Sequence, residues 1–237
     1  MTTLIAFDTA TERLTIALRH GQRTWSHAGE GGAKSSATLI PAVFALLREA
    51  GLELADLDAI AFGRGPGAFT GLRTACSVAQ GLAFGADKPV LPIDNLLAVA
   101  EEARAGAEAF RVWAAIDARM AQIYAAEYEY GGGLWTVHVA PMLTDADALT
   151  RRWHDEPPSA IAGDALRIYA DRLSTGAAIL APQATSNALS MLALAGAAWH
   201  AGAAVDAALA LPLYVRDKVA ETTVERAARV GAALARS

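Results

Sequence analysis

Hydrophobic and polar positions at the start of the chain alternate or group in short runs, and this pattern predicts three consecutive strands. Residues 3–8 form one apolar run, residues 14–19 alternate, and residues 24–28 follow after a turn. The spacing then becomes helical over residues 37–50, 72–84 and 95–104, with apolar strands at 57–62 and 88–93 between these helices. The order βββαβαβα predicts parallel pairing of the later strands through helical crossovers.

The same order of elements begins again after Gly106. Strands are predicted at 111–117, 122–130 and 134–139, then helices at 145–153, 165–173 and 188–200 with short strands at 159–163 and 178–180. Asp8 and Asp117 each end the first strand of their half, which indicates a weak internal duplication. We therefore expect two lobes, residues 1–105 and 106–216, each a mixed sheet with a three-strand meander and flanking helices. A last amphipathic helix within residues 217–237 is expected to pack back on the first lobe.

Composition indicates an ordered protein, because 54% of the residues are hydrophobic and only 19% are charged. The net charge of −5 disfavours a dedicated nucleic-acid binder, since the phosphates would meet a negative field. The single cysteine, Cys76, excludes an intramolecular disulfide and fits a reducing compartment. The first residues show no signal-peptide pattern, and no charge-free run reaches about 18 residues. These features predict a cytoplasmic protein with no membrane span.

A glycine-rich stretch at residues 63–73, GRGPGAFTGLR, joins the strand at 57–62 to the helix that follows. Glycines permit positive φ and close backbone approach, and a helix start offers unpaired N–H groups. Such a junction can hold an anion or seat another polypeptide. The residues of this loop that we single out are Gly63, Arg64, Gly65, Pro66, Gly67, Phe69, Thr70, Gly71 and Arg73.

Two readings remain open for Asp8 and Asp117. Two carboxylates facing a cleft could belong to a vestigial nucleotide site with Thr9 and Arg119, holding magnesium through water. Alternatively, each aspartate caps the turn after its strand. The turns favour capping, because side chains follow both aspartates where a phosphate would need glycine. We expect weak nucleotide binding at most, and no intrinsic cofactor.

Candidate catalytic and metal-binding residues do not form a recognisable constellation. The five histidines never recur at the spacing of three or four that places ligands on one helical face. Cys76 lies on the apolar stripe of a helix, which indicates packing more than reactivity. We assign no catalytic residue and no metal site.

Four segments together resemble the bacterial TsaB (YeaZ) family: FDTAT at 7–11, the glycine stretch at 63–73, IDARM at 116–120 with Tyr124, and PLYVR at 212–216. The resemblance runs nearly end to end, and the glycine stretch is its most specific part. It implies an actin/sugar-kinase-like pair of lobes. It also implies a role in forming threonylcarbamoyladenosine at position 37 of tRNAs that read codons beginning with A. The TsaB-like subunit would be catalytically silent, in a complex with the enzyme TsaD and the ATPase TsaE, and tRNA would be met only through that complex.

One departure from TsaD-like proteins can be read directly. Those proteins carry a metal-binding Asn-His-x-x-x-His motif, and the corresponding histidine positions here hold Asn95 and Val99. Asparagine is a poor substitute for an imidazole ligand, and valine cannot coordinate. This supports a silent relative and disfavours the alternatives: a stand-alone metal- or ATP-dependent hydrolase or phosphotransferase of the glycoprotease type, or a nucleotide-sensing module.

The resemblance further implies that the helix after Ser36 and the helix after Thr70 form the surface for TsaD, or for a homodimer. The first helix is apolar over too wide an arc for one buried face, and the second carries small residues suited to close packing. The alternative is that both helices are sandwiched within the lobe. The predicted partner-binding residues are Ser36, Leu39, Ile40, Val43, Phe44, Leu47, Leu72, Ala75, Cys76, Ala79 and Leu82.

Overall fold

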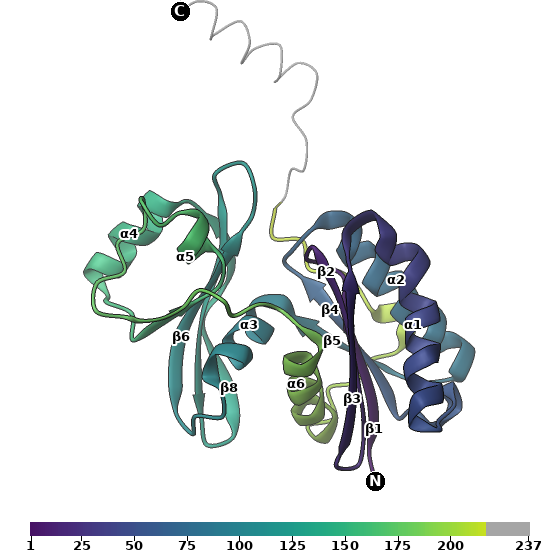
Figure 1. Cartoon of the computed structure of the whole chain (residues 1–237). Helices are drawn as coiled ribbons and strands as arrows, with labels where there is room; N and C mark the ends of the chain where they lie inside the picture. Colours follow the sequence, from purple (N-terminus) through teal and green to yellow (C-terminus); the bar gives the residue numbers. More distant parts are fainter. Residues whose placement is uncertain (217–237) are drawn as a thin grey trace, which may run out of the picture.

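Two five-stranded mixed sheets form the cores of two lobes in the computed structural model, which describes residues 1–216 (Figure 1). The first sheet contains β1 (Thr3–Asp8), β2 (Arg13–His20), β3 (Arg23–Glu30), β4 (Ala59–Gly65) and β5 (Val90–Asp94). Its order is β3-β2-β1-β4-β5, antiparallel within the meander and parallel from β1 through β4 to β5. The meander and the crossovers predicted from the pattern are confirmed.

Helices cover both faces of this first sheet. On one face lie α1 (Ser35–Ala50) and α2 (Phe69–Ala86), which bury Ile5 and Phe7 of β1. On the other face α6 (Ala188–His200) buries Leu4 and Ala6. The successive residues of β1 thus point to opposite apolar layers, which explains why this strand is a continuous hydrophobic run. Short 3-10 helices lie at Gly32–Lys34, Leu54–Asp56 and Ala207–Leu209.

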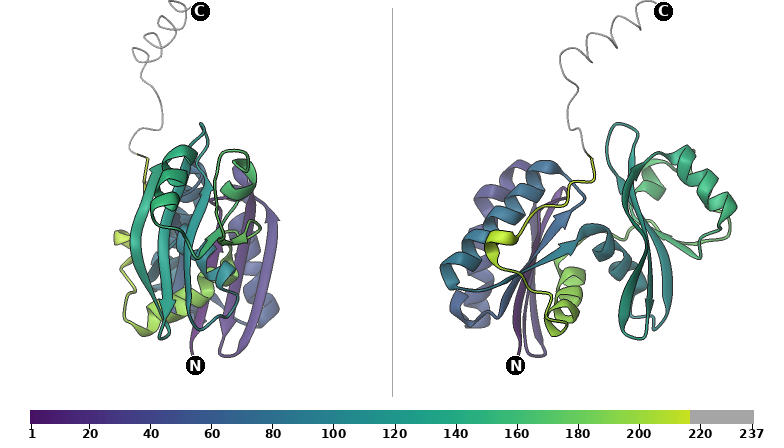
Figure 2. Two further views of the ribbon diagram at one scale, coloured as in Figure 1. Left: turned by 90° about the vertical axis from the view of Figure 1, so that its left-hand side faces the viewer. Right: turned by 180° about the vertical axis from the view of Figure 1, so that it is seen from behind.

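The second sheet repeats the topology of the first. It contains β6 (Phe110–Asp117), β7 (Ile123–Gly131), β8 (Leu134–Thr144), β9 (Ala160–Ala162) and β10 (Ile179–Ala181), in the order β10-β9-β6-β7-β8. On one face lie α4 (Ala146–Asp155) and the short α5 (Ala165–Ile168), and on the other lies α3 (Asn95–Arg104) (Figure 2). The expected architecture, two α/β lobes that are each a mixed sheet with a three-strand meander and flanking helices, is confirmed.

The predicted assignment of residues 106–216 to one lobe is wrong for its last part. After β10 the chain returns to the first lobe, where α6 packs on β1, β2, β4 and β5. Val205 then bridges to Val90, and Ala210 enters the core beneath α2. Conversely α3, predicted within the first lobe, buries Leu96 and Val99 against the second sheet. Each lobe therefore contains one helix from the other half of the chain.

Two smaller differences concern element ends. The helix predicted at 165–173 stops at Ile168, where the chain turns into loops. The predicted helix within 217–237 lies outside the described residues. Across residues 1–216, every helix is too short or too polar to cross a membrane.

Candidate functional site

The glycine loop is shaped by close packing against the turn between β1 and β2. A Cβ added at Gly71 would lie 1.9 Å from the carbonyl oxygen of Thr9, and one at Gly67 would lie 2.8 Å from the Cβ of Ala10. Gly65 has φ of +125°, and its Cβ would lie 2.6 Å from the carbonyl oxygen of Leu213. These glycines are required because backbone of other segments approaches them directly.

Polar contacts fix the same loop. The Ala68 N–H donates to the Ala10 carbonyl at 3.0 Å, and the buried Thr9 hydroxyl donates to the Gly71 carbonyl at 2.7 Å. The Gly65 N–H donates to Asn95 Oδ1 at 2.7 Å, and Arg64 forms an ion pair with Asp94. The motif loop is thereby tied to the first turn of the chain and to the start of α3.

A cleft of about 1010 Å³ separates the lobes, and residues from both lobes line it. Asp8 does not line the cleft: its side chain is fully buried beneath the lining residues Asn95 and Ser186, which both bond to it. Asp8 Oδ1 accepts from the Ala10 N–H at 2.8 Å, while Oδ2 accepts from Ser186 Oγ at 2.7 Å and from Asn95 Nδ2 at 3.0 Å. Burial raises the pKa of the Asp8 carboxyl, and the hydrogen bonds from Ser186, Ala10 and Asn95 oppose that rise. The capping expected of Asp8 is present, through Ala10.

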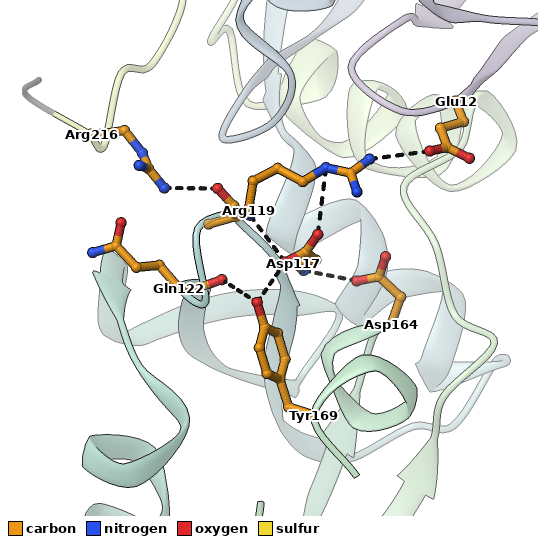
Figure 3. Close-up of polar contacts among 8 residues, drawn as sticks. Glu12, Asp117, Arg119, Gln122, Asp164, Tyr169 and Arg216 are labelled. Atoms are coloured by element: carbon orange, nitrogen blue, oxygen red, sulfur yellow. Dashed lines mark hydrogen bonds and ion pairs between the residues drawn. The ribbon is translucent and has the colours of Figure 1, made fainter. Parts of the chain in front are cut away.

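Asp117 lies on the opposite wall of the cleft (Figure 3). Its Oδ1 accepts from the Arg119 N–H at 3.0 Å, which is the expected turn cap, and lies 2.7 Å from the Tyr169 hydroxyl. Desolvation, together with the hydrogen bond and charge of Asp117, raises the pKa of Tyr169 to about 12. The Asp117 N–H in turn donates to Asp164 Oδ1 at 2.9 Å. Asp8 and Asp117 thus have separate sets of partners within the protein.

The turn that follows Asp117 has an unusual backbone. Arg119, Met120 and Ala121 have φ of 63°, 55° and 57°, so three successive residues with side chains are left-handed. Such conformations cost about 1–3 kcal/mol each and persist only where the surroundings hold them. The turn directs Arg119 across the cleft, where its guanidinium lies 3.1 Å from Glu12 Oε1 of the first lobe (Figure 3).

Most of the predicted partner-binding residues lie inside the first lobe, and this part of the prediction is wrong. Leu39, Val43 and Leu47 of α1 belong to the core cluster, as do Ala75, Cys76, Ala79 and Leu82 of α2, and Leu72 is only 2% exposed. The apolar arc of these helices is wide because they pack on the sheet and on each other. Ser36, Ile40 and Phe44 face outward.

The residues at the positions of the absent histidine pair are also integrated into the fold. Asn95 joins Asp8 to Ser186, and Val99 is completely buried in the core beneath the second sheet. In the described part of the chain, no three histidine, cysteine, aspartate or glutamate side chains gather as metal ligands would.

The segment PLYVR at 212–216 runs along the mouth of the cleft. The Leu213 N–H donates to the Arg64 carbonyl at 2.7 Å, and the Tyr214 ring packs on Phe69 with centroids 5.3 Å apart. Tyr214 also accepts from Arg73 Nε at 3.2 Å. Arg216 reaches the second lobe, where its Nη2 donates to the Ala118 carbonyl at 2.7 Å. This segment, itself one of the four motifs singled out in the sequence, therefore contacts two of the other three, the glycine stretch and residues 116–120.

Sequence reasoning missed several of these functional contacts. Glu12, Ser186, Asp164 and Tyr169 had no local pattern that marked them. Their partners are distant in the chain: Glu12 and Arg119 are 107 positions apart, and Ser186 and Asp8 are 178 apart.

Comparison with known proteins identifies the family. Residues 26–232 match the family model described as TsaD, tRNA N6-adenosine threonylcarbamoyltransferase. The tRNA threonylcarbamoyladenosine biosynthesis protein TsaB of Haemophilus influenzae is 48% identical over 124 residues, 52% of either chain. A solved structure, YeaZ from Pseudomonas aeruginosa, is 39% identical with a TM-score of 0.81, covering 90% of this chain and 100% of that one. The chain belongs to the TsaB (YeaZ) family.

A second solved structure of the same organism, an uncharacterized protein with similarity to peptidase YEAZ, is also 39% identical and has a TM-score of 0.83. The TsaB match in Escherichia coli is 40% identical over 133 residues. The matched region covers 52% of the Haemophilus influenzae protein and 58% of the Escherichia coli protein, so the chain spans just over half the length of these curated TsaB relatives. Within this TsaB-family chain, the motif loop, the cleft and the segment 212–216 form one connected site.

Proposed function

We propose that this protein is a non-catalytic partner of TsaD, acting with TsaE, in forming threonylcarbamoyladenosine at position 37 of tRNAs that read codons beginning with A. Membership of the TsaB family carries the proposal. It is supported by the state of the two carboxylates, since Asp8 and Asp117 are each held by donors of the protein itself. In this proposal the protein is cytoplasmic, it contacts tRNA only as part of the complex, and the chain has no cofactor of its own.

The docking surface in this proposal is the outward side of α1 and α2. Ile40 and Phe44 are 40% and 41% exposed, and they follow Ser36 at successive intervals of four, so all three lie on one stripe of α1. On α2, the exposed residues recur at helical spacing: Thr70, Arg73, Ser77, Gly81, Phe84 and Gly85. A groove of about 400 Å³ lies between this stripe and Ser36.

Small residues suit this surface to helix packing. A Cβ at Gly81 would meet nothing within 4 Å, so a partner helix could approach the α2 backbone there. Phe84, which is 86% exposed, lies at the end of the same stripe and would gain the most from being covered. The same face would carry a homodimer when the partner is absent.

Binding to the cognate TsaD tests the surface. We expect Phe44→Asp and Ile40→Asp to weaken binding at least about tenfold, since a carboxylate would be buried without a partner. Leu134→Asp is the matched control, because Leu134 is 67% exposed but lies on β8 of the other lobe. Failure of the unaltered chain to co-migrate with TsaD at micromolar concentration would contradict the proposal.

The cleft favours a second candidate function, a nucleotide-sensing module, because its volume of about 1010 Å³ would admit a small molecule. Calorimetry with ATP and ADP tests it. Turnover of either nucleotide by the isolated chain, abolished by Asp117→Asn, would instead support a stand-alone hydrolase or phosphotransferase.

A further inference from the structure

Within residues 1–216, the two lobes are joined covalently on one side of the cleft only. The chain leaves the first lobe at the start of α3 and returns between β10 and α6 (Figures 1 and 2). Residues of both crossings, Asn95 and Ser186 among them, line the base of the cleft. Both are fixed to one carboxylate, since Asp8 accepts hydrogen bonds from Asn95 on the first crossing and from Ser186 on the second. This base is buried and is the place where a hinge between the lobes would lie.

The opposite side of the cleft is bridged by side chains. The segment 212–216 is anchored to the first lobe through Leu213 and Tyr214, and its last residue, Arg216, donates to the Ala118 carbonyl on the second lobe. Arg216 Nη1 also lies 3.2 Å from Met120 Sδ. From the other direction, Arg119 pairs with Glu12 of the first lobe.

We propose that these contacts, Arg216 with Ala118 and Arg119 with Glu12, form a latch across the mouth of the cleft, and that breaking them lets the second lobe rotate away about the Asp8 base. The proposal concerns the motion of the lobes and does not depend on the partner or the reaction.

The latch is weak enough to open. Arg119 and Glu12 are 76% and 90% exposed in their side chains, and an ion pair between such exposed groups changes an equilibrium by only about one- to fivefold. Val215 adds a half-buried apolar contact with the core beneath the second sheet. At the base, in contrast, the Asp8 carboxylate is fully buried and accepts hydrogen bonds from Ala10, Asn95 and Ser186. The contacts at the mouth therefore break before those at the base do.

The latch also connects the cleft to α2. Tyr214 packs on Phe69, the first residue of α2, and accepts a hydrogen bond from Arg73, whose guanidinium carbon lies 4.0 Å from the Phe69 ring centroid. A displacement of the start of α2 would therefore move Tyr214 and, through the short segment 214–216, Arg216.

Energy transfer between dyes on the two lobes tests the proposal. Glu49 and Asp155 are exposed, and the helices that carry them, α1 and α4, lie on the outer sides of the two lobes (Figure 1). Glu49→Cys and Asp155→Cys therefore carry the dyes, in a Cys76→Ser background that keeps a donor toward the Ala210 carbonyl. We expect Arg216→Ala to raise the ratio of open to closed molecules about threefold, because it removes a part-buried hydrogen bond. The double variant Arg216→Ala with Glu12→Gln should raise it about tenfold, because the exposed ion pair is lost as well.

Arg13→Ala is the matched control, since this exposed arginine lies beside Glu12 in sequence and its side chain forms no ion pair or hydrogen bond with the second lobe within residues 1–216. Raising the salt from about 20 mM to about 500 mM should shift the unaltered protein toward the Glu12→Gln distribution, because salt screens exposed pairs. Identical distributions for the unaltered protein and the double variant would overturn the latch, as would an equal shift in Arg13→Ala.

Discussion

Replacing Gly71 with alanine would place a methyl group 1.9 Å from the carbonyl oxygen of Thr9 and 3.0 Å from the Cα of Ala10. Both atoms belong to backbone, so no side-chain rotation relieves the contact, and α2 must move away from the β1–β2 turn. Overpacking of this kind costs about 1–3 kcal/mol. The movement also weakens the buried hydrogen bond from Thr9 to Gly71, worth about 1 kcal/mol.

Alanine gains about 0.5–1 kcal/mol over glycine within a helix, which offsets part of this loss. The net destabilisation is therefore about 2 kcal/mol, and the midpoint of thermal unfolding should fall by about 4–8 °C for a chain of this size. Gly81→Ala is the matched control on the same helix, because its Cβ meets nothing within 4 Å. It should raise the stability by about 0.5–1 kcal/mol.

Urea unfolding of both variants, followed by circular dichroism, measures the difference. If Gly71→Ala were as stable as Gly81→Ala, the glycine motif would not serve to seat α2 on the first turn of the chain. The reading of the motif as a packing device would then be refuted.

Further predictions concern the two carboxylates. Asp8→Asn should lower the free energy of unfolding by about 1–3 kcal/mol. In one orientation the new NH₂ group faces the Ala10 N–H, and in the other it faces Asn95 Nδ2, so in both cases two donors meet. Burial raises the pKa of Asp8 above 3.8. Protonation of Asp8 therefore stabilises the folded protein at low pH, and this contribution is lost as pH rises through the folded pKa. In paired urea titrations, the difference in free energy of unfolding between the unaltered protein and Asp8→Asn should narrow from pH 4 upward. Tyr169→Phe should cost about 1–2 kcal/mol and should remove the tyrosine that ionises near pH 12 in absorbance titration.

The hydrophobic pattern was sufficient to predict the order of elements, the three-strand meander of each lobe and the helical crossovers, because period-two and helical spacings alternate clearly along the chain. It could not predict which sheet each helix covers. The sequence of α6 is apolar on nearly all sides, so nothing local distinguishes packing on its own lobe from packing on the first. That choice depends on the path of the chain after β10.

The site shows the same limit. The capping roles of Asp8 and Asp117 follow from local turns and were predicted, whereas their long-range partners Ser186 and Tyr169 were not. The apolar arc of α1 could not separate its buried side from its exposed side: the pattern selects Leu39 and Phe44 equally, and only packing on the sheet shows that Leu39 is buried and Phe44 is exposed.

Reconstituted tRNA modification by the cognate TsaD and TsaE, with and without this chain, tests the central proposal most directly. We predict modification only when the chain is present, a marked loss with Phe44→Asp, no loss with Leu134→Asp, and no modification by the chain alone. Equal modification without the chain, or modification by the isolated chain, would contradict a non-catalytic partner role.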